Sequence, residues 1–167
     1  KINNVRYLAG YQLNIKYDPE VLQPVNPKTG AEFTERTMPV NGNLLMNEEY
    51  GPTNMVANNI KSGILNFGCV YTYANDYKAV GIDEHTGIIG EIGFKVLKSK
   101  NTSIKFEDTL TMPDAISGTN LFNWDSEIIT GYSVIQPDPI IIEAEPLKDA
   151  YVSMELDKTK VKVGDII

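Results

Sequence analysis

Side chains that could carry out catalysis are few in this chain. His85 is its one histidine and Cys69 its one cysteine. These counts exclude an intrachain disulfide, a zinc site built on two histidines and a CxxC motif. Cys69 lies in an apolar alternation close to Phe67 and Val70, where a free cysteine is typically a small buried hydrophobe.

Carboxylates are the remaining candidates for chemistry. Glu107 and Asp125 could act as a glycosidase pair, but no feature of the sequence sets the ~5–9.5 Å separation that this chemistry requires. The Asp-Glu-His run at 83–85 fits a solvated turn better than a metal site, because adjacent side chains diverge. Residues 76–83 lack the alternating oxygen ligands and central glycine of a calcium loop. We therefore expect no enzyme and no metal on this chain.

Composition narrows the class further. The 167-residue chain has 15 Lys and Arg against 22 Asp and Glu, a net charge of −7, so we expect no nucleic-acid partner. It has no apolar run of roughly 18 residues, so we expect no membrane insertion. It begins at Lys1 without a Met or a signal peptide, which predicts a fragment of a longer protein.

Alternation of apolar residues predicts that strands make up most of the fold. Tyr11, Leu13 and Ile15 alternate with polar residues, which is typical of a half-buried strand. We expect strands over residues 11–17, 64–73, 87–97, 103–106, 120–124 and 128–135, a loop over 19–30, and a short strand or flap over 31–38. A helix is expected over 73–80, ended by Gly81. Short strands separated by turn signals predict an antiparallel β-sandwich.

The C-terminal part differs in character. Residues 137–150 have the proline and acidic content of an extended linker, although Ile140–Ile142 is apolar enough to dock. Residues 151–167 alternate again, starting with Val152 and Met154. The predicted organisation is a module at 1–136, a linker at 137–150 and a separate strand at 151–167.

Several strings resemble a type II cohesin module. They are AGYQLNIKYDP at 9–19, GILNF at 63–67, TGIIGEIGF at 86–94, FEDT at 106–109 with the Met112–Pro113 pair that follows, LFNWD at 121–125 and ITGY at 129–132. The similarity runs almost continuously from Lys1 to Pro137, which makes it more specific than any single string.

The resemblance implies a nine-stranded jelly-roll β-sandwich with one short helix, from a cellulosome scaffold or anchoring protein. Such a module is non-catalytic and binds a type II dockerin, outside the cell, at the bacterial surface or in a cell-free cellulosome. It implies no cofactor on this chain, since the dockerin carries the calcium. The family's first strand would precede Lys1. Residues 151–167 resemble that strand, so we expect them to supply it by folding back or in a strand-swapped homodimer.

The resemblance also implies a binding face made by strands three, five, six and eight of the family. Residues that alternation places outward on the matching strings are Gln12, Asn14, Lys16, Asn66, Gly68, Val70, Thr72, Ile89, Glu91, Gly93, Asn123 and Asp125. On the last strand an alternative register turns Phe122 and Trp124 outward instead. Val70 and Ile89 would give dry contact area, and the two glycines would let a partner helix approach closely.

Two other functions stay open. A carbohydrate-binding module is also a β-sandwich, and Trp124, Tyr50, Tyr73 and Tyr77 could supply its aromatic rings. A scaffold domain that only spaces its neighbours would bind no ligand at all.

Overall fold

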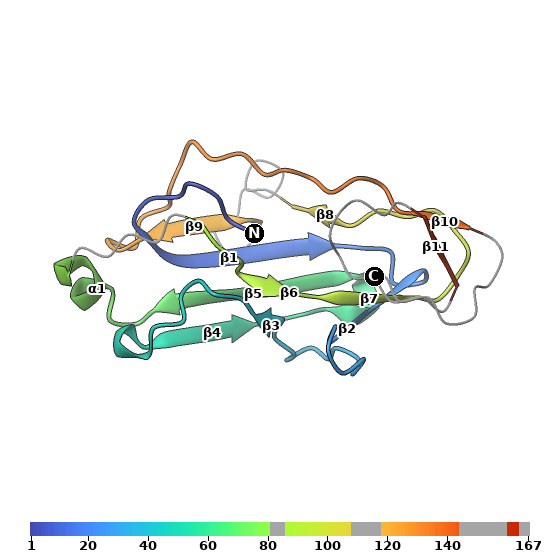
Figure 1. The fold of residues 1–167 in the computed structure, drawn as a ribbon, viewed down its shortest axis with the longest axis horizontal. Helices are drawn as coiled ribbons and strands as arrows, with labels where there is room; N and C mark the ends of the chain where they lie inside the picture. The colour runs from blue at the N-terminus through green and yellow to red at the C-terminus, as the bar shows by residue number, and fades with distance from the viewer. Residues whose placement is uncertain (81–85, 108–117, 144–159, 164–167) are drawn as a thin grey trace.

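The computed structural model describes residues 1–80, 86–107, 118–143 and 160–163. Its main feature is a five-stranded antiparallel sheet in which β4, β5 and β1 lie side by side. Strands β8 and β9 pair with successive stretches of the other edge of β1 (Figure 1). The bounds are β1 Leu8–Lys16, β4 Pro52–Val56, β5 Ile64–Tyr71, β8 Lys105–Phe106 and β9 Asn120–Asn123.

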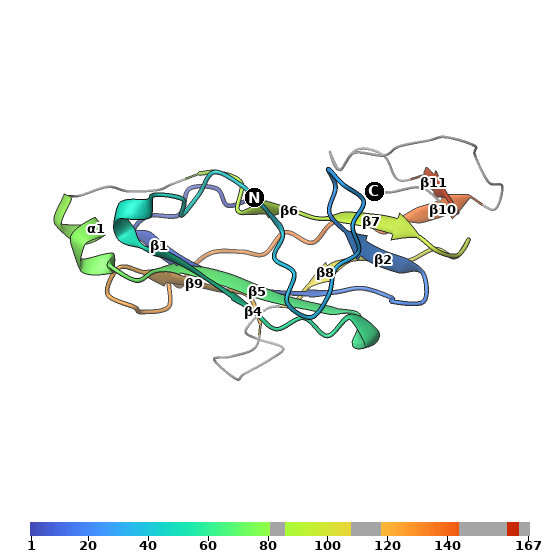
Figure 2. The same cartoon turned by 90° about the horizontal axis from the view of Figure 1, so that it is seen from below.

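A second layer faces this sheet (Figure 2). It contains three strand pairs, which are β2 (Leu22–Val25) with β7 (Gly93–Val96), β3 (Val40–Asn41) with β6 (Gly90–Glu91), and β10 (Ile141–Glu143) with β11 (Lys160–Lys162). Helix α1 (Ala74–Val80) lies at one end of the sandwich, and the short 3-10 helices η1 (Glu48–Tyr50) and η2 (Ile60–Ser62) flank β4. The predicted β-sandwich with one short helix is confirmed.

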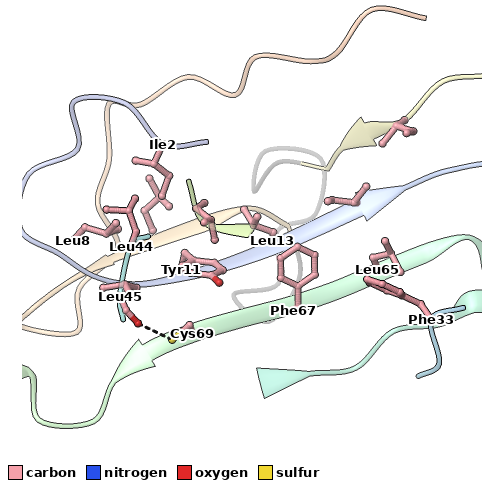
Figure 3. Close-up of a cluster of buried hydrophobic side chains, with 14 of the residues drawn as sticks. Ile2, Leu8, Tyr11, Leu13, Phe33, Leu44, Leu45, Leu65, Phe67 and Cys69 are labelled. Atoms are coloured by element: carbon pink, nitrogen blue, oxygen red, sulfur yellow. Dashed lines mark hydrogen bonds between the residues drawn. The ribbon is translucent and has the colours of Figure 1, made fainter. Parts of the chain in front are cut away.

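The core lies between the layers and follows the alternation of β1 and β5. Tyr11, Leu13 and Ile15 of β1 face inward opposite Cys69, Phe67 and Leu65 of β5 (Figure 3). Cys69 is buried, and its thiol donates a weak hydrogen bond to the Leu45 carbonyl oxygen at 3.9 Å. It is the packed hydrophobe that its sequence context indicates.

Aromatic packing holds α1 against the sandwich. A helix of two turns is marginal alone, but Tyr77 is fully buried, with ring centroids 5.3 Å from Tyr50, 5.2 Å from Tyr71 and 5.8 Å from Trp124. Tyr50 and Tyr77 are therefore core residues and cannot form a sugar-binding platform. Of the four rings considered for that role, Tyr73 alone is exposed, at 55%.

Several strand predictions were wrong. Strands β2, β3, β4 and β10 lie where no strand was expected, and residues 128–135 form only an isolated bridge between Ile128 and Phe122. Strand β4 pairs with β5 on one edge. Strand β2 pairs with β7 and meets residues 32–33 on its other edge, where the Pro24 carbonyl oxygen accepts from the Phe33 amide at 2.9 Å. Neither arrangement needs a donor from the proline, so each strand can tolerate a proline and irregular alternation. Both strands contain a proline, since Pro24 lies opposite Phe94 and Pro52 lies opposite Tyr71.

The apolar run within the expected linker packs on the sandwich. Ile140 and Thr102 exchange both backbone hydrogen bonds, at 3.1 and 2.8 Å, and the Ile142 amide donates to Oδ1 of Asn101 at 3.1 Å. The Ile142 side chain is buried in the core. Strand β11 pairs in parallel with β10 of the same chain, which gives no support to strand exchange between copies. Gly81 and the strand expected over 151–167, apart from residues 160–163, lie outside the described residues, and the domain boundaries and the origin of a first strand stay predictions.

Candidate binding surface

The five-stranded sheet turns one face away from the core, and this face is called the outer face below. Strand register sets its rows, because Gly10 pairs with Val70, Gln12 with Gly68, and Asn14 with Asn66. Neighbouring strands extend these rows at one edge through Thr53 and Met55 and at the other through Phe122 and Asn120. The outer face comprises Thr53, Met55, Asn66, Gly68, Val70, Thr72, Gly10, Gln12, Lys16 and Phe122, together with the buried Asn14 and Asn120.

Apolar and hydrogen-bonding groups are interspersed on the outer face. Met55 is 47% exposed, and Val70 and Phe122 are partly exposed. The hydroxyls of Thr53 and Thr72 lie 2.6 Å apart and share a hydrogen bond across β4 and β5. The expected positions Gln12, Lys16, Asn66, Gly68, Val70 and Thr72 all lie on this face.

The two glycines of the outer face meet different neighbours. A Cβ on Gly68 would lie 2.5 Å from the Tyr11 carbonyl oxygen, so the close approach of β1 and β5 requires glycine there. A Cβ on Gly10 would instead lie 2.7 Å from Cγ1 of Val70, which is a side chain that can move. Gly68 therefore has a role within the sheet, in addition to any contact with a partner.

Asn14 is a correction to the expected set, because it is only 4% exposed. It lies where the edge of β1 passes from β9 to β8, and the Glu107 amide donates to its carbonyl oxygen at 2.9 Å. The nearby Lys16 remains exposed and lies 3.6 Å from a carboxylate oxygen of Glu107. Asn14 therefore lies on the outer face but offers a partner almost no surface.

Ile89, Glu91 and Gly93 were placed on the wrong sheet. They lie in and beside β6 and β7, which pair with β3 and β2 in the opposite layer. Ile89 also points inward and belongs to the core, while Ile88 is exposed. The amides of Asn43 and Leu44 both donate to the Ile88 carbonyl oxygen, at 2.8 and 3.2 Å, an irregularity of the β-bulge kind that shifts the alternation.

Asn123 and Asp125 are engaged in a turn at the end of β9. Oδ1 of Asn123 accepts from the amides of Asp125 and Glu127, each at 2.9 Å. The Asp125 carboxylate forms an ion pair with Lys78 of α1. The alternative register is half right, since Phe122 turns outward opposite Gly10 while Trp124 packs against the core.

Thr53 and Met55 are binding candidates that sequence reasoning missed. Both lie on β4, the strand at the edge of the sheet, opposite Val70 and Gly68. The turn-forming Gly51-Pro52 pair followed by the β-prone residues Thr53 and Val56 is the signal that could have located this strand.

The described residues bring together no catalytic or metal-binding group. Glu107, which follows β8, pairs with Lys16. Asp125, which follows β9, pairs with Lys78, so the two carboxylates belong to separate ion pairs. Within the described ranges no three His, Cys, Asp or Glu side chains are grouped to hold a metal ion. The run at 83–85 lies outside them. In the same part of the chain, no helix has the length and apolar character to cross a membrane.

The chain is thus a β-sandwich with a packed interior and a broad outer face of mixed apolar and polar character. The chain belongs to the cohesin family, whose domain matches residues 1–120. Cohesin domains are non-catalytic, in agreement with the expectation of no enzyme.

Similar proteins refine this assignment. The chain is 72% identical over its full length to cell surface glycoprotein 1 of Acetivibrio thermocellus, of which it spans 7%. A type II cohesin–X-dockerin complex from Acetivibrio cellulolyticus contains a chain 49% identical, with a TM-score of 0.76 and 83% of each chain covered. Type II cohesin A11 from Bacteroides cellulosolvens is 34% identical, with a TM-score of 0.73 and 84% and 85% of the chains covered. The solved relatives are type II cohesins, as the sequence resemblance implied.

Proposed function

We propose that the outer face binds a type II dockerin and that the chain serves cellulosome assembly or cell-surface anchoring. One observation carries the proposal: the outer face presents exposed apolar side chains among hydrogen-bonding ones, spread over neighbouring strands of one continuous sheet. The type II cohesin–X-dockerin complex of a relative 49% identical to this chain supports the choice of partner.

Contact chemistry on the outer face suits a protein partner. Met55 and Val70 would supply apolar anchors, because protein interfaces concentrate their affinity in a few desolvated side chains. Gln12 and Asn66 would supply hydrogen bonds, and Lys16 a positive charge towards one end. A patch of roughly 800 Å² per partner is the usual size of a specific interface.

The same proposal implies where the calcium is bound and where the chain acts relative to the cell. The calcium would belong to the dockerin, as the resemblance to type II cohesins implies. An extracellular location, at the cell surface or in a released cellulosome, is supported by the cell surface glycoprotein to which the chain is 72% identical.

Isothermal titration with a purified type II dockerin tests the proposal. We expect 1:1 binding in calcium and loss of binding in chelator. Met55→Asp should weaken binding about tenfold or more, or at least ~1.4 kcal/mol, because it replaces an apolar anchor by a charge. Glu91→Lys is the matched control, since Glu91 is exposed on the opposite layer and should leave affinity unchanged.

Each variant must keep the melting temperature of the parent chain for this comparison to hold. Equal losses from Met55→Asp and Glu91→Lys would contradict the outer face as the site. Absence of binding by the folded parent chain would contradict the dockerin proposal and favour a ligand-free spacer.

A further inference from the structure

The outer face ends in a pair of lysines on neighbouring strands. In the register of β1 and β8, Lys16 lies directly opposite Lys105, and Ile64 of β5 lies on the other side of Lys16. Both lysines are exposed, whereas the preceding residues Ile15 and Ile104 are buried in the core. Residues directly opposite each other on antiparallel strands have Cβ atoms about 4.5–5.5 Å apart. Two positive charges therefore share one small area at this end of the outer face.

One carboxylate accompanies this lysine pair. An oxygen of Glu107 lies 3.6 Å from Nζ of Lys16, and the Glu107 side chain is 23% exposed. Among the residues that the structure describes, the Lys105 side chain forms neither an ion pair nor a hydrogen bond. Like charges directly opposite each other destabilise a pair of strands. The cluster thus keeps an excess of one positive charge that no ion pair within the described chain explains.

Charge complementarity indicates what the lysine pair can bind. The chain carries a net charge of −7, so most of its surface repels an acidic group at long range. A local excess of positive charge reverses this at one place, and a carboxylate is the group with which an ammonium forms charge-assisted hydrogen bonds. Lys16 also continues the row of Gln12 and Asn14 along β1. A partner that covers the outer face would therefore reach the lysine pair.

We propose that Lys16 and Lys105 together recognise a carboxylate of the dockerin, next to the apolar part of the outer face. This inference rests on the proposed function and names the chemistry that the partner must present at one end of the same face. Glu107 is then an internal counter-ion, which competes with the partner's carboxylate for Lys16. Since exposed interfacial charges act mainly on the rate of association, the lysine pair speeds docking more than it prolongs the complex.

Association kinetics of the full chain with a purified type II dockerin in calcium test this inference. We expect Lys105→Gln to slow association about threefold or more at low salt, and the difference to become small at ~0.5 M salt, because salt screens exposed charges. Lys95→Gln is the matched control. It makes the same change in net charge at an exposed lysine of β7 in the opposite layer, and it should leave the rate nearly unchanged.

Glu107→Gln should have the opposite effect. It removes the carboxylate beside Lys16 and keeps the shape of the side chain, so we expect association to become about twofold faster or more at low salt. Lys105→Arg keeps the charge and should keep the parent rate. The melting temperature of each variant should stay within about 1 °C of that of the parent chain, because exposed ion pairs contribute little to stability.

Three results would overturn the inference while dockerin binding stands. They are an unchanged rate in both Lys105→Gln and Glu107→Gln, an equal loss from Lys105→Gln and Lys95→Gln, and a loss from Lys105→Gln that salt does not reduce. The last result would mean that the shape of the side chain matters and its charge does not. Absence of binding by the folded parent chain would instead overturn the proposed function, and this inference with it.

Discussion

At the scale of single residues, the outer face depends on two glycines, Gly68 and Gly10, whose lack of a side chain leaves room for neighbouring atoms. Gly68 lets β1 and β5 approach until its own Cβ position lies 2.5 Å from a main-chain oxygen. Gly10 leaves room for the Val70 side chain on the neighbouring strand. Glycine at these two positions is thus explained by packing within the sheet. A partner could also approach the sheet closely there.

Substitution of the two glycines by alanine should lower the stability of the chain to different extents. We expect Gly68→Ala to lower the free energy of unfolding by about 1–3 kcal/mol, because overpacking against main-chain atoms must move a strand. Gly10→Ala should cost about 1 kcal/mol or less, since Val70 can change rotamer. Urea unfolding of the two variants checks this. A larger loss from Gly10→Ala would contradict the steric explanation.

Asp18 should make stability depend on pH at the acidic end. A hydrogen bond from Lys100 at 3.0 Å, and then one from the Glu20 amide, hold the pKa of this carboxyl below its ordinary value near 3.8. A lowered folded-state pKa contributes stability that is present above the ordinary value and is lost as pH falls through the lowered pKa.

The Asp18→Asn variant should therefore lose less stability than the parent chain between about pH 4 and pH 2. Melting temperatures measured across that range provide the test. Lys100→Gln should have the same effect, and the double variant should add little to either, because both changes remove one ion pair. Parallel pH curves for the parent chain and Asp18→Asn would contradict this assignment.

At the scale of elements, sequence alternation located the strands that lie in the middle of the sheet. Strands β1 and β5 alternate regularly because each pairs on both sides and packs on one layer, so Gln12, Asn66, Val70 and Thr72 could be placed on the outer face from sequence. Edge strand β4 gave no comparable signal. Met55 was missed for that reason.

Alternation could not assign strands to layers. A strand with one apolar side has the same local pattern in either layer of a sandwich, so Glu91 and Gly93 were placed on a sheet to which they do not belong. The irregular hydrogen bonding at Ile88 then reversed the side of Ile89. Both errors concern pairing between distant segments, which periodicity along the chain does not encode.

Strand β10 should contribute to the stability of the sandwich. Ile142 is 6% exposed and packs in the core, so Ile142→Ala should lower the free energy of unfolding by about 2–5 kcal/mol. Ile135 is 81% exposed on the preceding segment, and Ile135→Ala should change it by about 0.5 kcal/mol or less. Urea denaturation measures both. Equal effects would show that β10 is not part of the cooperative unit.

At the scale of the whole molecule, the two layers are built differently. The five-stranded sheet presents a continuous outer face, whereas the opposite layer is made of short strand pairs. The continuous sheet is therefore the layer that suits the docking role proposed for the outer face.

Methyl NMR of the chain during titration with a type II dockerin tests the central claim most directly. Met55 and Val70 report on the outer face, and the exposed Ile88 and Leu97 report on the opposite layer. We predict that the Met55 and Val70 resonances shift or broaden with dockerin in calcium while those of Ile88 and Leu97 stay in place. Shifts at Ile88 and Leu97 with Met55 and Val70 unchanged would contradict the account.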